Sequence, residues 1–79
     1  MLELRPNCEC CDQDLPPESE QAMICSFECT FCRDCVDHRL QGVCPNCGGN
    51  FSPRPIRPES KLEKNPPSIR RVFNPNSCA

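Results

Sequence analysis

Few segments of this chain have the periodic spacing of hydrophobic residues that builds regular secondary structure, and one of them indicates a helix. Within residues 33–41 (RDCVDHRLQ), Val36 and Leu40 are four positions apart, and Asp34 falls in the first turn. Gly42 follows and is suited to end the helix. The pattern predicts a helix of about two turns, too short to be stable without tertiary contacts.

Two other segments indicate short strands. Residues 22–27 (AMICSF) are apolar enough for one strand, and a second is expected to end at Phe51. The acidic, proline-containing stretch 12–20 predicts a loop. The small shared core is expected to consist of Phe27, Phe31, Val36, Leu40 and Val43.

The cysteine content changes this picture of a weakly hydrophobic chain. The 79 residues include ten cysteines, ten prolines, four phenylalanines and no tryptophan or tyrosine. A chain this short rarely buries enough apolar surface to offset the loss of backbone entropy, about 1 to 2 kcal/mol per residue. Its fold is therefore expected to depend on bound metal or on disulfides.

The N-terminal sequence helps to decide between bound metal and disulfides. MLELRPNC lacks the basic and apolar regions of a secretory signal peptide, and no apolar stretch is long enough to span a membrane. The sequence therefore predicts a cytoplasmic protein without a membrane partner. Thiols stay reduced in the cytoplasm, where clustered cysteines more often bind metal, so metal is favoured over a disulfide scaffold.

Charge and proline content divide the chain into a cysteine-rich module, residues 1–58, expected to bind zinc through the cysteine pairs described next, and an extended or disordered basic, proline-rich tail, residues 59–79. Residues 1–53 hold nine acidic and three basic side chains, whereas residues 54–79 hold six basic and two acidic ones. Six prolines lie from Pro53 onward, and proline fixes an extended backbone and removes a hydrogen-bond donor. The sequence thus predicts an acidic module joined to a basic arm.

Eight of the cysteines form four close pairs, a grouping typical of structural zinc sites. A gap of two or three residues lets both sulfurs of a pair bind one Zn²⁺ at about 2.3 Å, and two pairs complete a tetrahedron. Such closed sites, with no open position, are structural rather than catalytic. The pairs are Cys8/Cys11, Cys25/Cys29, Cys32/Cys35 and Cys44/Cys47.

Spacing by itself leaves the grouping of these pairs open. In a sequential arrangement, neighbouring pairs share an ion and form two separate beads. In an interleaved arrangement, the first pair joins the third and the second joins the fourth, which locks both ions into one unit. An iron–sulfur cluster is a further alternative, because Cys29, Cys32, Cys35 and the later Cys44 resemble a bacterial ferredoxin run, although the last gap is eight residues rather than three.

The ordered gaps resemble those of the RING finger family. Phe31 precedes the fifth ligand, a short helix follows the sixth and a Cys-Pro-Asn-Cys run ends the series, while Cys29 replaces the histidine of most members. The resemblance implies a small metal-stapled α+β fold, a RING-like cross-brace with two zinc sites, one short helix and short β-hairpins. It implies a first site of Cys8, Cys11, Cys32 and Cys35 and a second site of Cys25, Cys29, Cys44 and Cys47.

Over nearly its whole length the chain also resembles a family of short bacterial cysteine-rich proteins, the domain of unknown function 1272. The shared segments are MLELRPNCECC, CSFECTFC, GVCPNCGG and PRPIRP. This resemblance implies a bacterial protein and brings no activity with it.

Three residues fall outside the eight-cysteine pattern. Cys10, between two presumed ligands, is expected to be a spare thiol, with replacement of a neighbouring ligand or a reactive role as alternatives. Cys78, near the C-terminus, is expected to be unused. His38 is expected to face solvent or to support a ligand from outside the coordination shell, since eight cysteines already complete two sites.

The sequence contains no pairing of nucleophile and base, so the chain is not expected to be an enzyme. Ubiquitin-ligase activity is not expected either, because Cys10 and Gly48 stand where RING ligases usually carry an apolar and a basic residue. The sequence favours a zinc-stapled adaptor for a protein partner, with the segment 68–73 (SIRRVF) as a candidate docking motif.

Two other functions stay open: a metal or redox sensor, and a protein that binds nucleic acid through its tail. Interspersed Glu59 and Glu63 and the scarcity of aromatic residues count against a dedicated nucleic-acid reader. The basic residues that would contact phosphates are Arg54, Arg57, Lys61, Lys64, Arg70 and Arg71.

Overall fold

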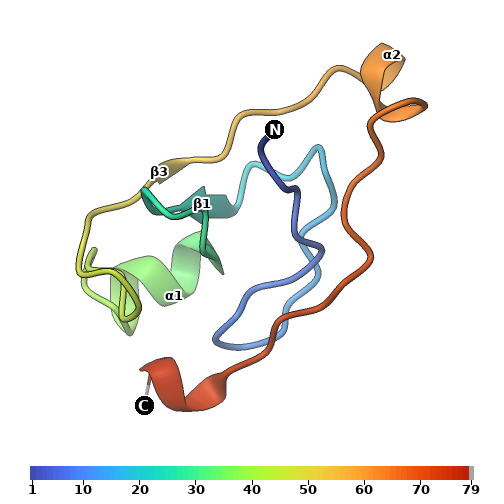
Figure 1. Cartoon of the computed structure of the whole chain (residues 1–79). Coiled ribbons are helices and arrows are strands. Elements are labelled where there is room, and N and C mark those ends of the chain that lie inside the picture. Colours follow the sequence, from blue (N-terminus) through green and yellow to red (C-terminus); the bar gives the residue numbers. More distant parts are fainter. Residues whose placement is uncertain (79) are drawn as a thin grey trace.

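The computed structural model describes residues 1–78 and is built around a three-stranded antiparallel sheet (Figure 1). Strands β1 (Ala22–Ile24) and β2 (Thr30–Cys32) form a hairpin. Strand β3 (Ser52–Pro53) pairs with the other edge of β1 and gives the order β2-β1-β3. The predicted α+β class is confirmed, although the first strand stops short of Phe27.

Helix α1 (Arg33–His38) follows β2 without a loop. Cys32 caps its N-terminus, because the sulfur accepts a hydrogen bond from the backbone N–H of Cys35 at 3.5 Å. The helix ends at His38 and not at the predicted Gln41, with Arg39 as its C-cap. Gln41 and Gly42, in the turn that follows, take left-handed backbone angles, φ 52° and 77°. A glycine adopts that conformation without steric cost, but Gly42 lies four residues beyond the last helical residue, so it does not end the helix as predicted.

The core lies between the sheet and α1. Phe31 pairs with Met23 across the hairpin, is fully buried and packs edge-on against Phe51, with ring centroids 5.5 Å apart. Val36 and Leu40 are buried beside it, as predicted. An aromatic pair of this geometry contributes about 0.5 to 1.5 kcal/mol beyond its burial.

The prediction that Phe27 and Val43 belong to this core is wrong, because their side chains are 75% and 53% exposed. Phe27 lies in the loop that joins β1 to β2, and Val43 lies directly before Cys44. Val43 is exposed beside the buried Cys44, and Phe27 is exposed together with Ser26 two residues after the buried Cys25. The hydrophobic character of a loop residue does not show whether its side chain is buried or exposed.

Leu4 and Leu15 are buried as well, together with the side chain of Arg54. The guanidinium donates to the carbonyl oxygens of Arg5 at 2.9 Å, Leu15 at 3.2 Å and Pro16 at 3.0 Å. Burial lowers the pKa of Arg54. Arg54, one of six basic residues considered for phosphate contact in the alternative nucleic-acid hypothesis, instead ties the segment after β3 to the N-terminal loop.

Of the segment predicted as a tail, residues 59–78 turn back toward the N-terminal residues (Figure 1). It begins with the short helix α2 (Glu59–Leu62), is extended over most of its course and ends in the 3₁₀ helix η1 (Pro75–Cys78). Residue 79 lies outside the described part of the chain. No helix within residues 1–78 is long and apolar enough to cross a membrane.

Backbone hydrogen bonds attach this segment to the module. The N–H groups of Ser68 and Asn74 donate to the carbonyl oxygens of Leu4 and Glu9 at 2.9 and 2.8 Å. Proline content predicted the extended conformation but gave no sign of these long-range contacts, because their partners are more than 60 residues away.

Side chains reinforce the attachment at its centre. Asn7 is buried, and its amide donates to the carbonyl of Val72 at 3.0 Å and accepts from the N–H of Val72 at 3.4 Å. Arg71 forms ion pairs with Asp12 at 3.0 Å and Asp14 at 2.8 Å. We call the contacts of residues 68–74 with residues 4–14 the tail clasp.

Candidate metal centres

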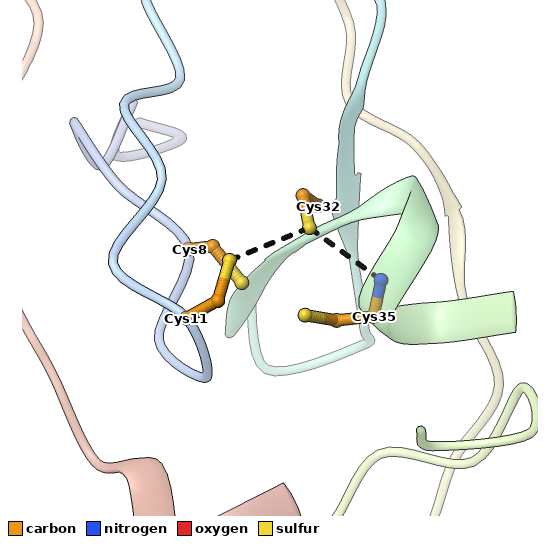
Figure 2. Close-up of side chains that lie close together, drawn as sticks. All are labelled: Cys8, Cys11, Cys32 and Cys35. Atoms are coloured by element: carbon orange, nitrogen blue, oxygen red, sulfur yellow. Dashed lines mark hydrogen bonds between the residues drawn. The ribbon is translucent and has the colours of Figure 1, made fainter. Parts of the chain in front are cut away.

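The first cysteine cluster joins the N-terminal loop to the start of α1 (Figure 2). Its members are Cys8, Cys11, Cys32 and Cys35, whose sulfur atoms all lie within 4.8 Å of one another. Cys8 and Cys11 come from the loop, Cys32 from the end of β2 and Cys35 from the first turn of α1. The structure thus brings together every residue predicted for the first site.

The distances within this cluster fit a single tetrahedral ion. Four sulfurs at about 2.3 Å from a central ion are separated by about 3.8 Å along each tetrahedral edge. The sulfurs of Cys11 and Cys32 are 3.8 Å apart. A disulfide needs a sulfur separation of about 2.05 Å, so this pair has the spacing of metal ligands rather than of a covalent bond.

The N-terminal loop presents Cys8 and Cys11 to one side. The N–H of Asp12 donates to the carbonyl of Cys8 at 2.9 Å and closes a tight turn, with φ of 65° at Asp12. Burial would raise the pKa of the Cys8 thiol, but backbone N–H groups, foremost that of Cys11, outweigh it and hold this pKa below its usual value. The turn therefore favours the thiolate that a metal requires.

The other half of the first cluster is less polar. Burial raises the pKa of Cys32 to about 11, and burial likewise raises the pKa of Cys35 well above its usual range. Without an ion, these two thiols hold their protons. A bound cation would displace the protons and remove the mutual repulsion of the thiolates, so charge and folding are coupled at this site.

The second cluster consists of Cys25, Cys44 and Cys47, whose sulfurs also lie within 4.8 Å of one another. Cys25 follows β1, and the other two flank the turn 44–47. The sulfur of Cys29, the fourth ligand predicted for this site, is not part of the cluster. The structure therefore brings together three of the four predicted residues.

Electrostatics differ across the second cluster. Burial raises the pKa of Cys25 to about 12. By contrast, the backbone N–H of Gly49 lowers the pKa of Cys47, at the surface, to about 7. The exposed side of this cluster carries a thiol that ionises near neutral pH.

The membership of the clusters decides between the alternative groupings. The first and third pairs meet in one cluster, and members of the second and fourth pairs meet in the other, so the arrangement is interleaved. The sequential arrangement is wrong. The iron–sulfur alternative disagrees with this geometry too, because Cys32 and Cys44, two of its ligands, belong to different clusters.

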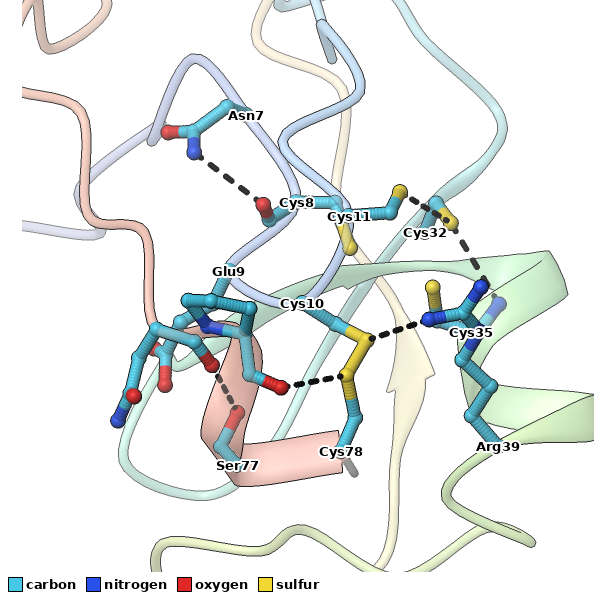
Figure 3. Close-up of a disulfide and its surroundings, with 12 residues drawn as sticks. Asn7, Cys8, Glu9, Cys10, Cys11, Cys32, Cys35, Arg39, Ser77 and Cys78 are labelled. Atoms are coloured by element: carbon cyan, nitrogen blue, oxygen red, sulfur yellow. Dashed lines mark hydrogen bonds between the residues drawn. A yellow bond between two sulfur atoms is a disulfide. The ribbon is translucent and has the colours of Figure 1, made fainter.

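Cys10 and Cys78, predicted to be a spare and an unused thiol, form a disulfide (Figure 3). Their Cα atoms are 5.8 Å apart, and the bond closes the chain over 68 residues. The prediction failed because only the tail clasp brings η1 beside the N-terminal loop. His38 agrees with expectation, since its side chain is 75% exposed and lies 3.5 Å from Asp34.

Asn7 is a site residue that the sequence did not single out. Its amide also donates to the carbonyl of Cys8 at 3.2 Å and to the carboxylate of Asp12 at 2.8 Å. Asn7 thus stabilises the loop that carries Cys8 and Cys11. A Pro-Asn dipeptide before the first cysteine indicates a turn, and that was the one available signal.

Two interleaved cysteine clusters on a three-stranded sheet define a class, that of small α+β proteins with two sites suited to metal ions. The family model described as "Protein of unknown function (DUF1272)" matches residues 1–57, and the chain belongs to this family. "Uncharacterized protein R02474" of Rhizobium meliloti (strain 1021) is 62% identical over 79 residues, which cover 100% of this chain and 94% of that protein. No solved structure matches the chain. The family resemblance predicted from the sequence is confirmed.

Proposed function

We propose that this protein is a non-catalytic module whose fold is held by two zinc ions and which acts as an adaptor for a protein partner in the bacterial cytoplasm, where the Cys10–Cys78 disulfide would be open to reduction. The observation that carries the proposal is the interleaving of the two cysteine clusters. Each cluster joins chain segments that no secondary-structure element connects, so bound ions would serve to hold the fold together.

Zinc is the ion that the donor set favours. Tetrahedral sites made of thiolates alone select zinc or iron–sulfur clusters, and the 3.8 Å sulfur separation in the first cluster suits one ion at its centre. A structural zinc supplies on the order of 10 to 16 kcal/mol of folding free energy. That is comparable with the whole stability of a domain, about 5 to 15 kcal/mol, so two ions suffice for a chain with this small a core.

Exposed apolar side chains support an adaptor role. Phe27 and Val43 project from the loops beside the second cluster, and Ile69 and Phe73 project from the segment predicted to dock. Ile69 is 95% exposed while its backbone neighbour Ser68 is bonded to the module. Large apolar groups held outward by a rigid frame are suited to bind a protein surface.

Two measurements test the proposal. Native mass spectrometry of the purified protein is expected to give two zinc ions per chain and, in the same spectrum, the number of subunits. Capture from a bacterial lysate is expected to retain a specific partner with the wild type and to lose it with Phe27→Ser or Ile69→Ser, while Asn50→Ala, at an exposed polar position, retains it. A chain that carries no zinc would refute the structural role.

Nucleic-acid binding through the tail has weaker support than it had from the sequence. Arg54 is buried, and Arg71 is paired with two aspartates. Arg57 donates to the carbonyls of Leu2 and Asn65, both at 2.7 Å. Half of the six basic residues thus satisfy groups of the chain itself, and a salt-dependent shift of labelled DNA or RNA is expected to be absent.

A further inference from the structure

The second cysteine cluster differs from the first in having three sulfurs and not four. Cys25, Cys44 and Cys47 form it, and among residues 1–78 no other Cys, His, Asp or Glu completes it. The residue expected in fourth place, Cys29, stands at the end of the same loop as Cys25. The question is whether this thiol is a ligand at all.

Each of the three clustered sulfurs is held by a backbone donor. The N–H of Phe27 donates to Cys25 at 3.3 Å, that of Asn46 to Cys44 at 3.4 Å and that of Gly49 to Cys47 at 3.4 Å. Such N–H groups two residues beyond a cysteine orient the sulfur and stabilise a thiolate. The three ligands are therefore positioned by the backbone before any ion arrives.

Cys29 is placed differently. Its carbonyl accepts from the N–H of Cys25 at 3.2 Å and closes the hairpin loop. The backbone donors to sulfur in this region reach Cys25, Cys44 and Cys47. The side chain of Cys29 is partly buried against the core, and its sulfur is not one of the three that cluster. The backbone of Cys29 thus closes the loop, while its sulfur lies outside the cluster of three.

The side of the cluster next to Cys47 also carries a hydroxyl group. The hydroxyl of Ser26 lies 3.9 Å from the sulfur of Cys47. A Cβ added to Gly49 would lie 3.5 Å from that sulfur and 3.7 Å from that hydroxyl, so a side chain at this position would contact both groups. A hydroxyl beside a three-sulfur site provides a hydrogen-bond partner for a ligand on the ion.

We propose that the second centre binds its zinc through Cys25, Cys44 and Cys47, keeps a fourth position open beside Ser26 for water or an external thiolate, and leaves Cys29 as a free thiol. This inference rests on the proposed zinc occupancy. Zinc sites with three protein ligands keep an exchangeable fourth position, whereas closed sites do not. The two centres then divide their roles, the first fixing the fold and the second able to exchange a ligand.

Thiol protection in the zinc-loaded full chain tests the inference directly. Brief treatment with iodoacetamide, followed by peptide mass spectrometry, is expected to modify Cys29 and to leave the seven ligand cysteines unmodified. In the cobalt-loaded chain, added mercaptoethanol is expected to strengthen the sulfur-to-cobalt charge-transfer band of the second equivalent as its thiolate takes the fourth position.

Matched variants give an independent readout. Cys29→Ser is expected to bind the second cobalt ion with unchanged affinity and an unchanged spectrum. Cys47→Ser is expected to weaken that ion at least about 100-fold, since loss of even an outer-shell partner costs about 10- to 100-fold. Cys29 protected from iodoacetamide, with Cys29→Ser as damaging as Cys47→Ser, would overturn the inference and leave the two-zinc module intact. A wild-type chain that holds no ion at the second centre would overturn both.

Discussion

Asn46 and Glu9 connect the two cysteine clusters by a hydrogen bond. The amide nitrogen of Asn46, in the turn between Cys44 and Cys47, lies 2.9 Å from a carboxylate oxygen of Glu9, which stands between Cys8 and Cys11. Glu9 is buried, and its own N–H donates to the carbonyl of Thr30 at 3.0 Å. The two loops that carry the cysteines of the first and second clusters therefore also contact each other directly.

Replacing Asn46 with alanine is expected to lower the free energy of unfolding of the metal-loaded protein by about 1 to 2 kcal/mol, because it removes a hydrogen bond to a charged group. Urea denaturation would measure the loss. Asn50→Ala is the control, since Asn50 is exposed and close by in sequence. Equal stability of the two variants would show that the contact between the loops contributes nothing.

Removing the metal is expected to unfold the chain. The strands have three, three and two residues and α1 has six, lengths that are not stable without tertiary support. A strong chelator should collapse the dispersion of amide signals in NMR spectra, and added zinc should restore it. Persistence of a dispersed spectrum without metal would contradict the structural role of the ions.

Cys32→Ser is expected to perturb the amide signals of residues 7–12 more than those of residues 44–47, since Cys32 shares a cluster with Cys8 and Cys11. Cys44→Ser should produce the reverse pattern around Cys25. Assigned NMR spectra of the two variants would reveal it. The opposite distribution, with Cys32→Ser acting on the turn 44–47, would indicate a sequential grouping.

Cys78→Ser is expected to reduce stability by roughly 2 to 4 kcal/mol, because the disulfide to Cys10 closes a long loop and so restricts the unfolded chain. A reducing agent should destabilise the wild type by the same amount and leave the variant unaffected. Calorimetry with and without the reductant measures both. A wild type indifferent to reduction would mean that the tail clasp holds without the covalent bond.

Arg54→Ala is expected to cost about 2 to 4 kcal/mol, since three carbonyl oxygens would lose their donor in a buried place. Arg54→Lys should recover only part of this, because an ammonium group lacks the planar fork of a guanidinium. Arg70→Ala, at an exposed position, is the control in urea denaturation. A loss equal to that of the control would contradict the internal role of Arg54.

The cysteine pairs and helix α1 could be predicted because their signals are local: gaps of two or three residues, and a four-residue hydrophobic repeat. The interleaved grouping needed the resemblance to a known family, since spacing permits several groupings. Arg54, Asn7 and the disulfide could not be predicted. Their partners lie tens of residues away, and nothing in an arginine, an asparagine or a terminal cysteine indicates which distant backbone it will meet.

Translation delivers the ligands in an order that the interleaved arrangement makes significant. Residues 8 to 35 leave the ribosome with a full set of four sulfurs for the first centre, while the second still lacks Cys44 and Cys47. At about 5 to 20 residues per second, the remaining stretch takes on the order of one second. The nascent chain can thus bind its first ion early. Cys25 then lies in the loop between Cys11 and Cys32 that this ion closes, and its own cluster is completed only when Cys44 and Cys47 have been synthesised.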